Sequence, residues 1–129
     1  MGATLTAAAI ELEPIVEGKG EQIAAETGLT ATREALIDIS QHLAQFAPDA
    51  ANDLMYGRLV AAFARGESLT GVDATFYQHE LIESRLMDAG MEARAAHLET
   101  LSIQGISYQK GYESLLYSPG AIKLFSPGY

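Results

Sequence analysis

TREALIDISQHLAQF, residues 32–46, is the stretch that decides the fold class. Its large apolar side chains follow the three- and four-residue spacing of one face of an α-helix: Leu36, Ile39, Leu43 and Phe46. Thr30 or Thr32 can cap the start of this helix. The pair Ala47-Pro48 should end it, because a residue that precedes proline avoids the helical conformation. The stretch therefore predicts an amphipathic helix that packs one face against a core.

The same signals continue toward the C-terminus. Residues 49–65 are predicted to form the next helix, with Asp49 as its N-cap and Gly66 at its end. The apolar stripe expected on this helix is formed by Leu54, Leu59, Ala62 and Phe63.

Two more helices are predicted beyond it. Residues 73–89 begin with Asp73 as a plausible N-cap and stop at Gly90, and residues 91–104 stop at Gly105. The short link at Gly90 favours an antiparallel pair of helices.

Both ends of the chain differ from its central part in amino-acid composition. Residues 3–16 are rich in alanine and predict a helix up to Pro14, and residues 21–27 predict a short helix closed by Gly28. After Gly105 the chain is rich in Tyr, Gly, Ser and Pro, and its two Ser-Pro-Gly triplets are interpreted as turns. Short helical pieces are expected there at 112–117 and 120–125. We therefore predict an all-α fold, a single domain over residues 1–129 with five or six helices and an irregular C-terminal segment.

Composition excludes several classes of function. The net charge is −9, with no basic patch or tail, so passive binding to nucleic acid or to an anionic membrane is not expected. The negative charge does not exclude a metal-dependent nuclease, because carboxylates bind the metal ion in such enzymes. The chain has no cysteine, which excludes disulfides, thiolate zinc sites and cysteine nucleophiles. No signal peptide and no apolar run of transmembrane length is expected.

FYQHELIESRLM, residues 76–87, contains the residues that best match a known catalytic motif. His79 and Glu80 match the opening of the zinc-protease signature H-E-x-x-H, but Glu83 stands where the second histidine belongs. On a helical wheel of about 100° per residue, all three share a face with the large apolar side chains. Buried charges are costly unless they are paired, protonated or bound to a metal. The predicted antiparallel partner helix can bring His97 toward Glu83 or Glu80.

Three interpretations of these residues stay open. In the first, His79, Glu83 and His97 bind a divalent metal and Glu80 acts as general base on a bound water. In the second, His79, Glu80, Glu83 and His97 perform acid–base catalysis without a metal. In the third, the His/Glu set forms an ion pair that only specifies helix packing. His42, on an otherwise ordinary amphipathic helix, is expected to be structural.

Tyrosines form a second candidate group. Tyr77, Tyr112, Glu113 and Tyr117 are predicted to bind substrate, because tyrosines can line a pocket or donate a proton. Each tyrosine can equally be a packing residue with a satisfied hydroxyl. No phosphate-binding glycine loop and no G-x-S-x-G motif occurs in the sequence.

The pieces DATFYQHELIESRLMDAGM, AHLETL and GISYQKGYESLLYSPGAIKLF, within residues 72–125, resemble C-terminal modules of bacterial polymorphic toxins and secreted effectors. The shared pattern is Y-x-H-E-L-x-E, then Ala-His, then L-Y-x-P. The resemblance implies an antibacterial domain that acts in the cytoplasm of a target cell and is neutralised by an immunity protein. Residues 1–50 lie outside the pattern and are either the front of the same domain or part of a carrier.

The leading hypothesis is therefore a small helical toxin domain with a hydrolytic site, nuclease-like or of another kind, at His79, Glu80, Glu83 and His97. The alternative is a non-enzymatic helical interaction or structural module. A metallopeptidase is a third hypothesis.

Overall fold

The structure, a computed structural model, describes residues 28–125. This part of the chain is all-α, as predicted, and contains five α-helices, one 3₁₀ turn and no strand. The elements are α3 (Arg33–Leu43), α4 (Ala50–Arg65), α5 (Gly71–Asp88), α6 (Ala93–Gln104), η1 (Tyr112–Leu115) and α7 (Pro119–Ile122). An isolated bridge between Leu29 and Leu69 joins the segment before α3 to the α4–α5 loop. The helices predicted at 3–16 and 21–27, and the Ser-Pro-Gly turn at 126–128, lie outside the described residues.

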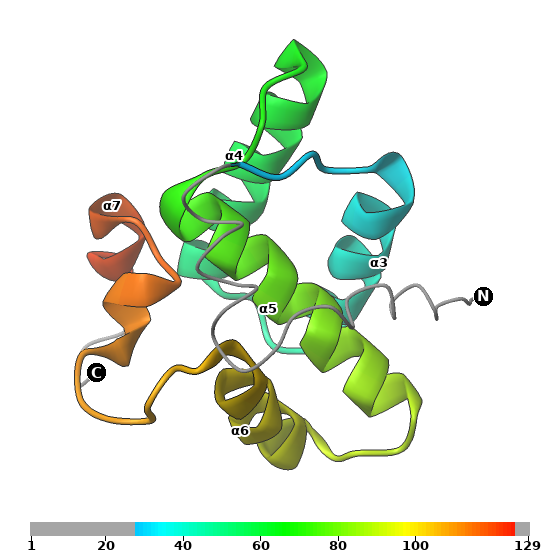
Figure 1. The fold of residues 1–129 in the computed structure, drawn as a ribbon, viewed down its shortest axis with the longest axis vertical. Coiled ribbons are helices and arrows are strands. Elements are labelled where there is room, and N and C mark those ends of the chain that lie inside the picture. Colours follow the sequence, from blue (N-terminus) through cyan, green and yellow to red (C-terminus); the bar gives the residue numbers. More distant parts are fainter. Residues whose placement is uncertain (1–27, 126–129) are drawn as a thin grey trace.

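Helix α5 runs through the middle of the molecule, with α3, α4, α6 and α7 around it (Figure 1). Every residue from Ala74 to Ser84 is buried, so α5 has no solvent-facing stripe over its central three turns. Gln78, on the side of α5 opposite Phe76, is buried as well, because neighbouring elements cover all sides of the helix. The main core gathers around α5 and includes Ile39, Met55 and Phe76, each with 0% exposure.

Most predicted helix boundaries are confirmed by cap geometry. Thr32 accepts a hydrogen bond from the Ala35 N–H, and Asp49 accepts from the Ala51 and Asn52 N–H groups. Gly66 and Gly105 end α4 and α6 in the left-handed conformation, which glycine adopts without steric cost.

The predicted start of α5 is wrong. The helix begins at Gly71 after Thr70, so Asp73 lies in its first turn. There Asp73 accepts two hydrogen bonds from the Arg58 guanidinium, at 2.7 and 3.1 Å, and ties α5 to α4.

Other local predictions also need correction. The buried face of α4 is Ala51, Met55, Leu59 and Ala62, and Phe63 of the predicted stripe is 41% exposed. Helix α3 ends at Leu43, so Phe46 falls beyond it on the surface. The first Ser-Pro-Gly triplet is a helix start, not a turn, because the Ser118 hydroxyl accepts from the Ala121 N–H and proline suits the first helical position.

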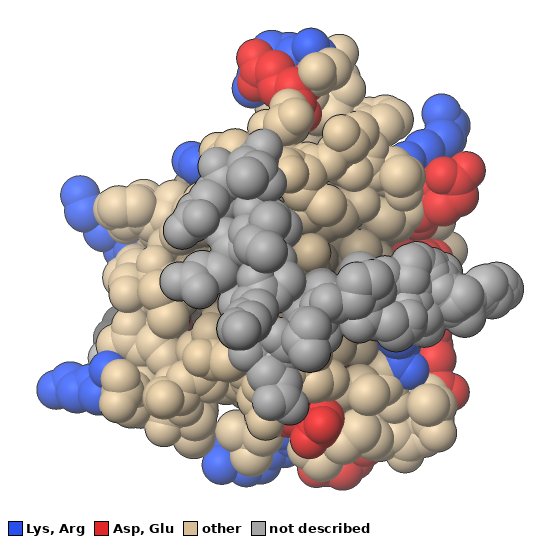
Figure 2. Space-filling model, viewed as in Figure 1, with Lys and Arg blue, Asp and Glu red and all other residues tan. Residues whose placement is uncertain are grey.

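None of the helices between residues 28 and 125 combines the length and the apolarity that crossing a bilayer requires. Charged side chains lie mainly around the margin of the face drawn in Figure 2, and the described residues form no continuous basic patch there.

Candidate functional site

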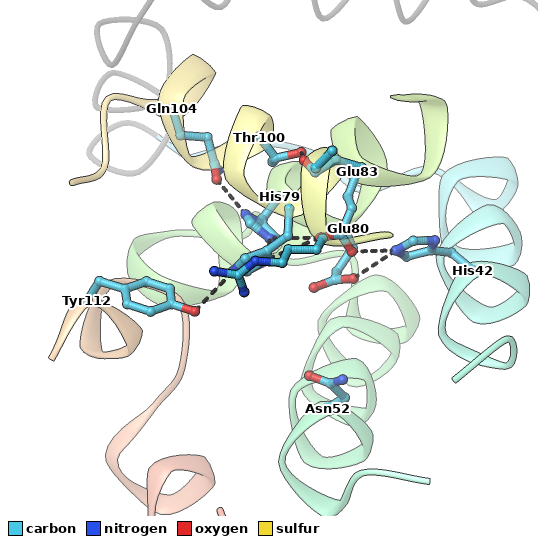
Figure 3. Close-up of polar contacts among 12 residues, drawn as sticks. His42, Asn52, His79, Glu80, Glu83, Thr100, Gln104 and Tyr112 are labelled. Carbon is cyan, nitrogen blue, oxygen red and sulfur yellow. Dashed lines mark hydrogen bonds and ion pairs between the residues drawn. The ribbon is translucent and has the colours of Figure 1, made fainter. Parts of the chain in front are cut away.

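All three histidines of the chain converge on one carboxylate, that of Glu83. His42 Nε2 lies 2.7 Å from Glu83 Oε1. His97 Nδ1 lies 3.1 Å and His79 Nε2 lies 3.6 Å from the other oxygen, Oε2. The carboxylate therefore joins side chains from α3, α5 and α6, and Figure 3 shows His42 approaching the glutamates of α5 from the α3 side.

The local structure explains this convergence. His79 and Glu83 are four residues apart, so they lie on the same side of α5. The link around Gly90 folds α6 back along α5, as predicted, and this brings His97 to Glu83. The predicted contact between His97 and Glu83 is thus confirmed. Glu80 faces His42 instead, and its Oε1 atom lies 3.5 Å from His42 Nε2.

The Gln104 side chain of α6, held by a backbone carbonyl of α5, keeps the His79 ring in place. The Gln104 amide nitrogen donates to the Thr75 carbonyl at 3.1 Å, which leaves the Gln104 amide oxygen as an acceptor. His79 Nδ1 lies 2.8 Å from that oxygen and must donate to it. His79 Nε2 then faces His97 Nδ1, 3.2 Å away, and Glu83 Oε2, 3.6 Å away.

Tyr112 of η1 completes the site on its outer side. Its hydroxyl lies 3.0 Å from His97 Nε2 (Figure 3). Burial, reinforced by the nearby charge of Glu113, raises the pKa of Tyr112 to about 12, so the hydroxyl keeps its proton at neutral pH. The contact leaves His97 Nδ1 facing Glu83.

The two glutamates have opposite electrostatics. Burial raises the pKa of Glu83, but hydrogen bonds from His42, His79 and His97 outweigh it and hold the pKa well below its usual range. Glu80 is fully buried, and its desolvation, together with the charges of Glu83 and Asp49, raises its pKa well above the usual value. The surroundings of Glu83 therefore favour its ionised form, whereas those of Glu80 favour its protonated form.

The residues also meet the geometry of a metal centre. Ligand atoms of His79, Glu83 and His97 lie within 4.8 Å of one another, and so do those of His42, Glu80 and Glu83. A tetrahedral ion with bonds of about 2.0–2.1 Å separates its ligand atoms by about 3.3 Å. The outer triad, His79, Glu83 and His97, has separations of 3.1, 3.2 and 3.6 Å, which bracket that value. Its donor set, two imidazoles and one carboxylate, is one that catalytic zinc sites use.

The outer triad is accessible on one side. The His97 side chain is 30% exposed, whereas those of Glu83 and His79 are 10% and 3% exposed. A cleft of about 390 Å³ opens beside it, lined among others by Tyr112, Glu113 and Tyr117. Because Tyr112 both lines this cleft and contacts His97, it connects the cleft to the outer triad.

The structure brings together three of the four predicted substrate-binding residues and places the fourth elsewhere. Tyr112, Glu113 and Tyr117 line the cleft, and the Tyr117 hydroxyl donates to Asn52 Oδ1 at 2.7 Å. Tyr77 is buried in the core on the α3 side, where its hydroxyl accepts from the Thr32 N–H at 3.1 Å. Tyr77 therefore has the packing role that was the alternative for each tyrosine.

His42 is the residue that the sequence interpretation left out of the site. It lies three residues after Ile39 on the buried face of α3 and is 2% exposed. The argument that singled out His79, a polar group on an apolar helix face, applies equally to His42. A wheel drawn for α3 would have identified it.

Comparison of the chain with protein-family models, with curated protein sequences and with solved structures finds no match. What the site does must therefore be argued from its residues: a buried carboxylate shared by every histidine of the chain, beside an aromatic and acidic cleft.

Proposed function

We propose that this chain is a metal-assisted hydrolase domain, with a divalent ion of the zinc class held by His79, Glu83 and His97. The observation that carries the proposal is the spacing of three ligand atoms close to tetrahedral edges, in a triad that is buried except at His97. A catalytic ion needs such a site, with three protein ligands and one position left for water or substrate.

Each neighbouring residue has a task in this proposal. When bound, the ion supplies a Lewis acid and lowers the pKa of a coordinated water. Gln104 fixes His79 with Nε2 toward the centre, as outer partners of metal-binding histidines commonly do. Tyr112 orients His97 and brings a protonated hydroxyl to the edge of the cleft, where it can donate to a leaving group. The sequence assigns Glu80 as general base, but its carboxyl lies on the His42 side of Glu83, so the proposal does not depend on that role.

The surroundings favour a neutral or cationic substrate over nucleic acid. Asp49 and Glu113 place carboxylates on the wall of the cleft, and the chain has a net charge of −9. Phosphodiester substrates are normally held by cationic side chains. Within the two predicted kinds of hydrolase, these charges therefore support a non-nucleolytic one.

The biological setting of the proposal comes from the residue pattern in positions 72–125. We propose that the domain is delivered by bacteria, acts in the cytoplasm of a target cell and is neutralised by an immunity protein. Inhibition of growth when the chain is expressed in bacterial cytoplasm is the assay that follows, because it needs no knowledge of the substrate.

The test compares three proteins in that assay. Wild type should stop growth, His97→Ala should not, and Glu99→Ala should behave as wild type, because Glu99 lies exposed on the same helix. The melting temperature of each purified protein shows whether the fold is kept. A folded His97→Ala protein that is as toxic as wild type would remove His97, and with it the outer triad, from the mechanism.

A second candidate is a non-enzymatic helical module in which the cluster only specifies packing. One observation favours it: within the described residues, every buried side-chain nitrogen and oxygen has a hydrogen-bond partner. Such a network can stabilise a unique core without doing chemistry. In that case wild type should not affect growth, and His97→Ala should change only the melting temperature.

A further inference from the structure

We infer that the His/Glu cluster is a two-metal centre, in which His42 and Glu80 hold a second divalent ion and Glu83 bridges it to the first. This inference deepens the proposed function and rests on it. The feature that points to it is the way in which the two oxygens of Glu83 divide the cluster into an outer half and an inner half.

Each oxygen of Glu83 faces its own set of ligand atoms. Oε2 faces His97 Nδ1 at 3.1 Å and His79 Nε2 at 3.6 Å, in the outer triad. Oε1 faces His42 Nε2 at 2.7 Å on the opposite side. A carboxylate that binds one ion through each oxygen is a common bridge in two-metal hydrolytic sites, where the ions lie about 3.5–4 Å apart.

The inner triad, His42, Glu80 and Glu83, supplies the donors that a second ion requires. Its ligand atoms lie within 4.8 Å of one another, and all three residues are buried. Glu80 Oε1 is 3.5 Å from His42 Nε2, which is long for a hydrogen bond but close to the edge of a tetrahedral ion, about 3.3 Å. The 2.7 Å contact between His42 and Glu83 is shorter than such an edge, because a proton now lies between the two atoms. An inner ion would take the place of that proton, which would be released to solvent, and His42 would move back by roughly 0.6 Å, the difference between the hydrogen-bond length and the ligand edge.

A purely structural role explains the inner triad less well. Leucine or methionine would fill the same volume, and replacing buried ionic groups with apolar ones is often neutral or stabilising. The chain instead buries two carboxyls that face the same imidazole, with Glu80 Oε1 at 3.5 Å and Glu83 Oε1 at 2.7 Å from His42 Nε2. A cation between Glu80 and Glu83 offsets the cost of burying two carboxyls, since it neutralises them without needing water.

The two ions would differ in their access to solvent. The outer triad reaches solvent through His97, which is 30% exposed, whereas the side chains of His42 and Glu80 are 0% and 7% exposed. Substrate therefore approaches the outer ion, and the inner ion acts behind it through Glu83 and any shared water. The inner triad contains one imidazole and two carboxylates, so it offers a harder donor set than the outer triad and suits Mn²⁺ as well as Zn²⁺.

The experiment measures how many ions the intact chain binds. Purified protein is stripped with a chelator, loaded with Zn²⁺, dialysed and examined by elemental analysis, and a parallel sample is titrated with Mn²⁺ and followed by electron paramagnetic resonance. Wild type should bind about two ions, and the two manganese ions should be magnetically coupled, as expected for a shared carboxylate and a separation of about 3.5–4 Å. His42→Ala and Glu80→Gln should each bind about one ion and give the uncoupled six-line signal.

Matched variants make the result specific. Glu34→Gln makes the same chemical change at an exposed position of α3 and should bind as many ions as wild type. Glu80→Gln keeps the shape of the side chain, so it guards against a His42→Ala protein that does not fold.

The outcomes also separate this inference from the proposed function. If wild type and Glu80→Gln each bind one ion, the inference of an inner site is wrong, and the outer triad remains the proposed metal site. Two ions in all variants place the second ion outside the inner triad and overturn the inference as well. No bound ion in wild type overturns both the inference and the metal-assisted function.

Discussion

Replacing Glu83 with glutamine should strongly destabilise the metal-free protein, whereas the same replacement at Glu80 should not. The two carboxyls lie three residues apart on α5, and both are buried. They differ in electrostatics, because imidazole contacts favour the ionised form of Glu83 and desolvation favours the protonated form of Glu80. Glutamine resembles a protonated glutamate in shape and polarity, so it imitates the state of Glu80 but not that of Glu83.

The contacts set the size of the effect. Glu83→Gln removes the charge that His42 and His97 approach at 2.7 and 3.1 Å, and breaking a buried charge network of this kind costs about 3–5 kcal/mol. In a chain of this size 1 kcal/mol corresponds to about 3–5 °C in Tm, so the Tm should fall by about 9–25 °C. Below pH 4.5, where Glu80 is neutral in the folded and the unfolded chain alike, Glu80→Gln should change the free energy of unfolding by no more than about 1 kcal/mol, since it replaces one neutral hydrogen-bonding group with another.

The dependence on pH gives a second signature with opposite signs. The lowered pKa of Glu83 adds stability above its ordinary value of 4.5, and this stability is lost as the pH falls. The raised pKa of Glu80 favours the fold below 4.5, and that contribution is lost as the pH rises toward the folded-state pKa. Relative to wild type, Glu80→Gln should therefore gain stability between pH 5 and pH 8, whereas the deficit of Glu83→Gln should stay nearly constant over that range and shrink as the pH falls below 4.5.

Urea unfolding followed by far-ultraviolet circular dichroism, with a chelator present, measures both quantities. The free energies of wild type, Glu80→Gln and Glu83→Gln are compared at pH 5 and pH 8. Equal losses in the two variants would refute the assignment of one ionised and one protonated carboxyl, and so would a larger loss in Glu80→Gln.

Three further predictions follow from other contacts. Tyr77→Phe removes the acceptor of the Thr32 N–H and should cost about 1 kcal/mol of stability without changing toxicity, and a loss of toxicity at unchanged stability would contradict the packing role of Tyr77. Gln104→Leu frees His79 Nδ1 and should weaken zinc binding about 10–100-fold in a competition titration, and unchanged affinity would show that the outer partner does not orient the ring. Zinc at about 100 times its dissociation constant should raise the free energy of unfolding of the stripped protein by about 2.7 kcal/mol, and no shift in thermal unfolding would speak against an ion bound by the folded state.

The helical fold could be predicted because its signals are local. The spacing of Leu36 and Ile39, the caps at Thr32 and Asp49, and glycines at helix ends act within a few residues. The errors arose where tertiary contacts decide between local options. Asp73 is an adequate N-cap by type, but its pairing with Arg58 of α4 places it inside the helix.

The candidate site was partly predictable for the same reason. His79 and Glu83 share one helix, and His97 follows after a short link, so this half of the cluster is encoded in neighbouring elements. The contact of His42 with Glu83 spans 41 residues of sequence, and no local pattern specifies it. The wheel also failed to show that α5 is surrounded, because it describes one helix and not what packs on its far side.

The complete burial of the middle of α5 ties assembly of the cluster to the folding of the chain. The α5–α6 hairpin brings His79, Glu83 and His97 together through short-range contacts, which form early because little loop entropy is lost. Glu83 reaches its third imidazole only when α3 docks against α5 from the other side. Docking of α3 thus covers one side of α5 and also closes the charge network, so a change at Ile39 in the core should disturb the position of His42, three residues along the same buried face.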